Sequence, residues 1–127
     1  MNRNGKFCTY HCEIEAAFAI IGGKWKARIL WHIGEGKPRF NELRDVLENV
    51  SPRMLAKQLR ELESDGLVIR TQHAEIPPRV EYRLTDAGKA LIPILESIST
   101  WVLDFCPCAA KRIAHCENPA GPQEETS

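Results

Sequence analysis

Apolar residues recur at intervals of three and four along the first half of the chain, which is the period of amphipathic helices. Ile14, Ala17, Phe18 and Ile21 share one side of a predicted helix over Glu13–Ile21, and the glycine pair that follows ends it. The same period predicts a second helix over residues 24–32, ended by glycines and Pro38. It also predicts a short third helix over residues 41–47.

The second half of the chain begins with a strong helix start, because Ser51 can cap a helix whose first turn accepts Pro52. This fourth helix is predicted to run to Asp65 and to end at Gly66. Two strand-like segments follow, over residues 67–73 and 79–84, and a turn separates them. A last helix is predicted from Thr85 and Asp86 to about Phe105.

The predicted order is four helices, a β-hairpin and a long helix. This order is typical of a winged helix-turn-helix, a mainly α fold with a small β-hairpin wing (α+β), here with a long C-terminal dimerisation helix. At 127 residues the chain has the length of one domain. We assign that domain to residues 13–105, preceded by a cysteine-containing extension over 1–12. Residues 106–127 are predicted to form a cysteine-containing, disordered tail.

The amino-acid composition limits the classes of function that the chain can have. The apolar share of 43% suits a globular protein, and no apolar stretch approaches the roughly 20 residues that span a bilayer. The N-terminus shows no secretory signal, so we predict a cytoplasmic protein with no membrane partner. The formal charge is zero overall, but residues 22–60 carry a net +5 and residues 61–127 a net −5. This asymmetry predicts one cationic face that binds a polyanion.

The fourth predicted helix has one apolar and one cationic side. At about 100° per residue, Arg53, Lys57 and Arg60 fall within roughly 60° of one another, and three leucines fall on the opposite side. Ala56 lies at the margin of the cationic side and would let the helix approach a groove floor closely. The major groove of B-DNA admits one helix, and arginine can bind guanine through two hydrogen bonds. The sequence therefore predicts that this helix reads double-stranded DNA.

Other residues complete the predicted DNA interface. Arg39 and Asn41, at the start of the third helix, are expected against the phosphate backbone, and Ser51 against a phosphate. Arg79, beside the predicted turn of the hairpin, is expected to reach the minor groove or the backbone. The full predicted set is Arg39, Asn41, Ser51, Pro52, Arg53, Ala56, Lys57, Arg60 and Arg79.

Several segments resemble the HxlR-type regulators, a MarR-like winged helix-turn-helix group. The similar segments are residues 12–17 (CEIEAA), 20–25 (IIGGKW), 39–43 (RFNEL), 51–55 (SPRML), 59–68 (LRELESDGLV) and 80–85 (VEYRLT). The resemblance implies a homodimeric transcriptional regulator from bacteria or archaea. It also implies, for many members, a response to electrophiles or oxidants through a cysteine just before the first helix, a position that Cys12 occupies here.

The last predicted helix carries a wide apolar stripe that needs a covering surface. Either the helix folds onto its own domain, or it pairs with a second copy of the chain. Because two reading helices about 34 Å apart match one turn of duplex, we favour the homodimer. The predicted dimerisation residues are Ile14 and Phe18 of the first helix with Leu91, Ile94, Leu95, Ile98, Trp101, Val102 and Phe105.

The five cysteines suggest redox or metal chemistry rather than structural disulfides, because the predicted compartment is reducing. The start of a helix stabilises a thiolate, so Cys12 is the predicted sensor for an oxidant or electrophile. Its resolving partner would be Cys8, or Cys106 or Cys108 of either chain. One alternative is a zinc or copper(I) sensor that uses the cysteines with His11 and His115. Another is that Cys106 and Cys108 have no function in the tail. No cofactor or bound metal is predicted.

An enzyme and a protein-binding module are the two other function classes. The four histidines lie without a carboxylate or nucleophile at motif spacing, and there is no glycine-rich phosphate loop, so the sequence predicts no enzyme. A winged helix that binds an acidic protein in place of DNA remains an alternative, since the same cationic helix would serve it.

Overall fold

The computed structural model describes residues 2–3, 6–7 and 10–110 of the chain. The mainly helical α+β winged helix-turn-helix that the sequence predicts is confirmed. The hairpins β1–β2 and β3–β4 are both antiparallel. The elements in chain order are β1 (Asn2–Arg3), β2 (Lys6–Phe7), α1 (Glu13–Ile21), α2 (Lys26–Gly34), α3 (Phe40–Val46), α4 (Pro52–Ser64), β3 (Val68–His73), β4 (Arg79–Leu84), α5 (Asp86–Phe105) and α6 (Pro107–Ala110).

Most predicted element boundaries agree with the structure, and α2 shows the largest shift. It begins and ends two residues later than the apolar period suggests. The positive φ of Gly23 (+91°) keeps the chain out of the helix before Lys26. At the other end, the amide of Glu35 donates to the carbonyl of Trp31 over 3.0 Å, which carries the helix through Gly34. The hairpin β1–β2 and the short α6 were not predicted.

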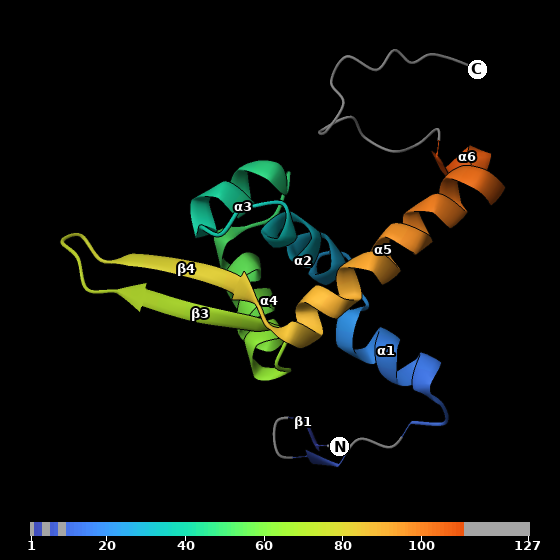
Figure 1. Cartoon of the computed structure of the whole chain (residues 1–127), viewed down its shortest axis with the longest axis horizontal. Helices are drawn as coiled ribbons and strands as arrows, with labels where there is room; N and C mark the ends of the chain where they lie inside the picture. The colour runs from blue at the N-terminus through green and yellow to red at the C-terminus, as the bar shows by residue number, and fades with distance from the viewer. Residues whose placement is uncertain (1, 4–5, 8–9, 111–127) are drawn as a thin grey trace. The chain divides into compact units, whose positions relative to one another are not determined.

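The hydrophobic core lies among α2, α3, α4 and the base of the β3–β4 hairpin, which extends away from these helices (Figure 1). Each helix contributes the apolar side that its period predicts. The largest fully buried side chains are Ile29, Leu30, Leu43, Leu47, Leu55, Leu59 and Leu62. This core fixes α4 by its leucine side and leaves its other side facing outward.

The turn between α3 and α4 is built from residues with special backbone roles. Asn49 has a positive φ of 72°, a conformation that asparagine tolerates better than most residues. Ser51 then caps α4, because its hydroxyl accepts a hydrogen bond from the amide of Met54 over 3.0 Å. Pro52 occupies the first helical position, where no amide hydrogen is needed. The helix-turn-helix geometry therefore follows from local sequence.

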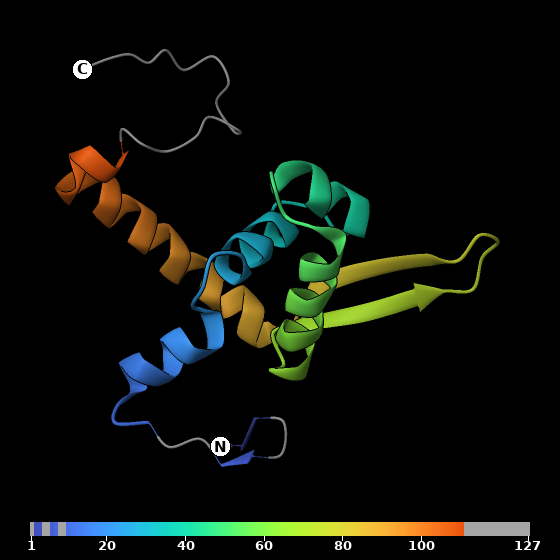
Figure 2. The ribbon, with the colours of Figure 1, turned by 180° about the vertical axis from the view of Figure 1, so that it is seen from behind.

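The wing is the β3–β4 hairpin, in which Val68 pairs with Leu84 at the base and His73 with Arg79 near the tip. Its second edge is also bound, because the amide of Tyr82 donates to the carbonyl of Pro38 over 2.8 Å. The segment before α3 thus lies alongside β4. This attachment joins the wing to the helix-turn-helix and has no counterpart in the sequence pattern. Seen from behind in Figure 2, the β3–β4 hairpin extends beyond α3 and α4.

The base of the wing is fastened to the start of α5. The hydroxyl of Thr85 donates to the carbonyl of Gly66 over 2.6 Å and accepts from the amide of Gly88 over 3.1 Å. Gly66 ends α4 with a φ of +80°, which favours glycine. A side chain at Gly88 would collide with the carbonyl oxygen of Leu67, so α5 packs this closely only because residue 88 is glycine.

The chain separates into two compact units, residues 1–95 and residues 96–127. The boundary falls within α5, two residues after Pro93, which has no amide hydrogen for the helix. The domain limits at residues 12 and 105 remain predictions. Among the described residues, no helix combines the length and the apolar character needed to cross a membrane.

Candidate DNA-binding site

The outer side of α4 carries three exposed cations, Arg53, Lys57 and Arg60. Its inner side carries Leu55, Leu59 and Leu62, which are at most 1% exposed. Within residues 10–109, whose side chains the structure describes, none of the three cations takes part in an ion pair. Their charge is therefore available to an external polyanion, and the predicted two-sided helix is observed.

The other residues predicted at the start of the two helices are also accessible. Ser51 and Pro52 are exposed at the N-terminus of α4, and Ala56 is half-buried beside the cations. Arg39 and Asn41 are exposed at the start of α3, where the backbone amide of Arg39 donates to Glu42 Oε1 over 3.1 Å. These positions place hydroxyl, amide and guanidinium donors where the two helices begin.

Arg79 differs from the cations of α4, because carboxylates already surround it. Its Nη2 lies 3.1 Å from Glu75 Oε2, and its Nε lies 3.9 Å from Glu81 Oε2. Glu81 also pairs with His73, whose Nε2 lies 3.1 Å from Glu81 Oε1. Arg79, the residue of the wing that is predicted to contact DNA, thus belongs to a charge network near the tip of the hairpin.

Glu81 is the centre of this network, and its pKa is held below the ordinary value of a glutamate. The hydrogen bond from His73 is the largest cause, and the charges of Arg79, His73 and Arg39 add to it, while burial opposes them. The carboxylate is therefore ionised throughout the neutral range. Since Arg39 is the N-cap residue of α3, the network also links the wing electrostatically to the helix-turn-helix.

We expect Glu81 to stabilise the fold in a pH-dependent way. Because its pKa is depressed on folding, its contribution is fully present above the ordinary pKa of a glutamate and is lost as the pH falls through the folded pKa. The replacement Glu81→Gln should therefore lower the free energy of unfolding at neutral pH and have little effect at strongly acidic pH. Urea unfolding of both proteins across the acidic range measures this, and a difference that grows on acidification would contradict it.

Lys26 belongs to the basic segment by sequence but does not contribute to the cationic face. Its side chain is only 7% exposed, and its Nζ lies 2.6 Å from Glu61 Oε1 of α4. Its neighbours Lys24 and Arg28 lie over the Trp25 ring, with Nζ 5.0 Å and Cζ 5.6 Å from the ring centre. Sequence reasoning missed this pair, although Lys26 falls on the same apolar stripe as the buried Ile29 and could have been recognised from it.

The cysteines occupy different surroundings. Cys12 is the exposed N-cap residue of α1, and its carbonyl accepts from the amide of Ala16 over 3.1 Å, so its predicted place at a helix start is observed. Cys106 is half-buried and Cys108 exposed, both as free thiols. Cys8, His115 and Cys116 lie outside the residues whose side chains are described. No group of three potential metal ligands occurs among the described residues.

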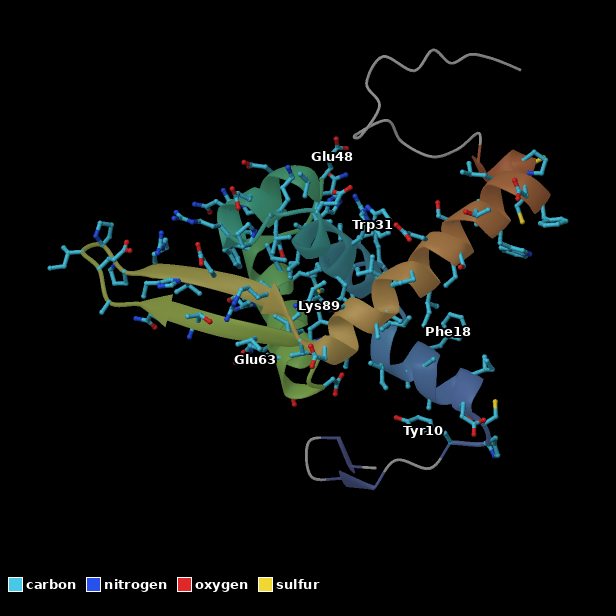
Figure 3. The ribbon with its side chains drawn as sticks, in the orientation of Figure 1. Tyr10, Phe18, Trp31, Glu48, Glu63 and Lys89 are labelled. Atoms are coloured by element: carbon cyan, nitrogen blue, oxygen red, sulfur yellow. The ribbon has the colours of Figure 1, made fainter. Side chains whose placement is uncertain are left out.

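The predicted dimerisation residues differ in exposure. On α1, Ile14 and Phe18 are 66% and 62% exposed, and Figure 3 shows Phe18 projecting from the helix. Leu91 and Leu95 instead pack partly against the core of their own chain. Val102 is half-buried within residues 96–127. The remaining members, all exposed, are Ile94, Ile98, Trp101 and Phe105, and the exposed Leu103 was not predicted.

A helix-turn-helix with an outward cationic helix, followed by a hairpin wing, defines a winged helix-turn-helix DNA-binding protein. The chain belongs to the family described as HxlR-like helix-turn-helix, whose profile matches residues 20–110. The resemblance stated from the sequence motifs is thereby confirmed. Members of this family are DNA-binding transcriptional regulators and not enzymes, so the chain is a transcriptional regulator of HxlR/MarR type.

Relatives and solved structures agree with this assignment. An uncharacterised HTH-type transcriptional regulator of Methanothermobacter thermautotrophicus is 48% identical over 92 residues, which are 72% of this chain and 70% of the relative. The oxidised form of the redox regulator HypR is 44% identical with a TM-score of 0.69, over 73% of this chain and 96% of that one. Reduced YodB from Bacillus subtilis is 34% identical with a TM-score of 0.68, over 76% and 96%.

Proposed function

We propose that the chain acts as a homodimeric regulator that inserts α4 into the major groove of a palindromic operator in the cytoplasm. The observation that carries this proposal is the outward, unpaired set of cations on α4, held in place by leucines on the opposite side. Arg53 and Lys57, near the N-terminus of α4, contact base edges or phosphates, and the small Ala56 permits close approach.

Phosphate contacts fix the register of α4 in the groove. Ser51, Arg39 and Asn41 lie at helix starts, where amide groups and the helix dipole favour anions. Arg60 adds a contact about one helical turn after Lys57 on α4. Arg79 approaches the neighbouring backbone or minor groove from the wing. Contacts of this kind make the affinity salt-dependent, while base contacts supply the sequence preference.

Pairing of two chains would cover the apolar residues that the single chain leaves exposed. Ile14 and Phe18 on α1 carry most of their surface in solvent, which is unusual for large apolar side chains unless a partner covers them. A dimer presents two copies of α4, matching two half-sites about one helical turn apart. Light scattering of the purified protein at micromolar concentration should give twice the chain mass, and a monomer mass would contradict the dimer.

Cys12 is proposed as the sensor of this regulator. It is exposed at the start of α1, and the solved structures similar to this chain include redox regulators in oxidised and diamide-treated forms. With a peroxide, the thiolate attacks one oxygen, the O–O bond breaks, and a proton is taken up to give a sulfenic acid and an alcohol or water. A second thiol, from Cys8, Cys106 or Cys108, then attacks the sulfenic sulfur and releases water as the disulfide forms.

The replacement Cys12→Ser is expected to abolish any change in DNA affinity on treatment with peroxide, because serine cannot form a sulfenic acid. Fluorescence anisotropy of a labelled operator, before and after oxidation and again after reduction with dithiothreitol, measures the change. Cys108→Ser is the matched control for losing one exposed thiol, and it becomes unresponsive only if Cys108 is the resolving residue. An unaltered response of the Cys12→Ser protein would exclude the proposed sensor.

The DNA-binding proposal itself is tested by selecting bound fragments from genomic DNA of the source organism with reduced and with oxidised protein. We expect enrichment of a palindromic motif that binds at physiological salt more tightly than an unrelated duplex of equal length. Equal affinity for both duplexes would argue against a sequence-specific regulator and would favour a winged helix that binds an acidic protein.

A further inference from the structure

The tip of the wing has an unusual composition for a surface expected near DNA. Residues 74–78 (AEIPP) contain no lysine or arginine, and their one charged residue is the acid Glu75. Ile76 beside it is fully exposed. The nearest cation in the sequence is Arg79, the first residue of β4, so this single side chain determines whether the tip attracts or repels phosphate.

One terminal nitrogen of the Arg79 guanidinium is already paired with a carboxylate of the same hairpin. Glu75 Oε2 lies 3.1 Å from Nη2, a terminal nitrogen of the fork. The Nε lies 3.9 Å from Glu81 Oε2, beyond hydrogen-bond distance, and is buried without a hydrogen-bond partner among the described residues. Arg79 is therefore held mainly through the terminal nitrogen that faces Glu75.

A carboxylate and a phosphate offer similar oxygen acceptors to a guanidinium, so Glu75 and a DNA phosphate compete for the positive charge and the donors of Arg79. Glu75 has the advantage of being only four residues away, across the turn. Its bond to Arg79 is nevertheless weak, because the two side chains are 49% and 33% exposed and an exposed ion pair contributes about 1 kcal/mol or less. A phosphate can therefore displace Glu75, but at a cost in affinity.

We propose that Glu75 is an affinity-setting residue of the DNA interface, because its carboxylate holds Nη2, one of the two terminal nitrogens of Arg79, and competes with a phosphate for the guanidinium. This inference rests on the proposed function. The cations of α4 have no such competitor within the described residues, so they bind phosphate or bases without first giving up an internal carboxylate. The displaced carboxylate of Glu75 also stays close to the bound phosphate and repels it.

The test is the replacement Glu75→Gln, which keeps the size of the side chain and removes its charge. Anisotropy titrations of a labelled operator in a NaCl series should show binding about 3- to 10-fold tighter at about 0.1 M salt. The slope of log affinity against log salt should steepen by about one, because no displaced carboxylate is left to take up a cation when Arg79 binds a phosphate. Combined with Arg79→Gln, the same replacement should lose most of its effect.

Glu96→Gln on α5 is the control, because it makes the same change in net charge far along the sequence from the wing. Equal gains from Glu75→Gln and Glu96→Gln, or a gain that persists without Arg79, would overturn the proposal, as would unchanged or weaker binding by Glu75→Gln. Failure of the unmodified protein to bind any selected duplex would instead contradict the proposed function, so the two failures are distinguishable.

Discussion

Replacing Arg53, Lys57 and Arg60 together by glutamine is expected to weaken operator binding by about a thousandfold or more. A good base contact by such a side chain contributes about 1–3 kcal/mol, and about 1.4 kcal/mol corresponds to a factor of ten. All three side chains are exposed and unpaired within the described residues, so no internal contact is lost. Anisotropy titrations over a range of salt concentrations should also show a slope smaller by about two or three.

The matched control for this triple replacement removes the same charge from other exposed positions. Lys24, Arg83 and Lys89 are exposed and lie outside the proposed interface. Their replacement by glutamine should change the affinity only through the weaker, screened effect of net charge. If both triple variants lost affinity to the same extent, the cationic side of α4 would not be the DNA-binding surface. Circular dichroism establishes that both variants are folded.

Removing the partner of the buried Lys26 should have the largest effect on stability. In Glu61→Ala, Lys26, whose side chain is 7% exposed in the unmodified protein, loses the carboxylate that lies 2.6 Å from its ammonium. Removing one partner of a buried ion pair costs about 3–5 kcal/mol, and we expect the lower end because Glu61 is one third exposed. Urea unfolding measures the loss, which would be a large share of the stability of a small domain.

Two further variants test whether the loss of stability comes from the Lys26–Glu61 ion pair or would follow from the removal of any glutamate of α4. Glu63→Ala removes an exposed acid from the same helix and should change the free energy of unfolding by about 0.5 kcal/mol or less. Lys26→Met in the Glu61→Ala protein replaces the buried ammonium by an apolar side chain and should recover much of the loss. If the Glu61→Ala protein were as stable as the Glu63→Ala protein, the ion pair with Glu61 would not be needed to stabilise the buried ammonium of Lys26, and the prediction would be wrong.

The order of elements and the direction of α4 could be predicted because both depend on neighbouring residues. The apolar period distinguishes the leucine side of α4 from its cationic side, and Ser51 with Pro52 marks its start. The family resemblance depends equally on short contiguous motifs, such as the glycine pair before Trp25. Residues close in sequence thus carry enough information for the helices, the wing and the candidate reading surface.

The partners of individual charges could not be predicted, because they come from different elements. Lys26 and Glu61 are 35 positions apart in the sequence and meet only after α2 has packed on α4. Arg79 is a cation beside a turn in the sequence, whereas in the structure two carboxylates surround it. A count of formal charges treats Lys26 and Arg79 as available to DNA, although both are paired with carboxylates. It therefore overestimates the charge of the cationic face.

The sequence by itself determined the fold class, the family and the side of α4 that presents its cations, since helical period, capping and turn residues act over a few positions. Only the tertiary structure decided that the carbonyl of Pro38 binds the edge of β4, that Lys26 is buried against Glu61, and that Glu75 holds Arg79. The physical reason is that hydrogen bonds and ion pairs depend on distances of a few ångströms, which packing sets once the elements are assembled.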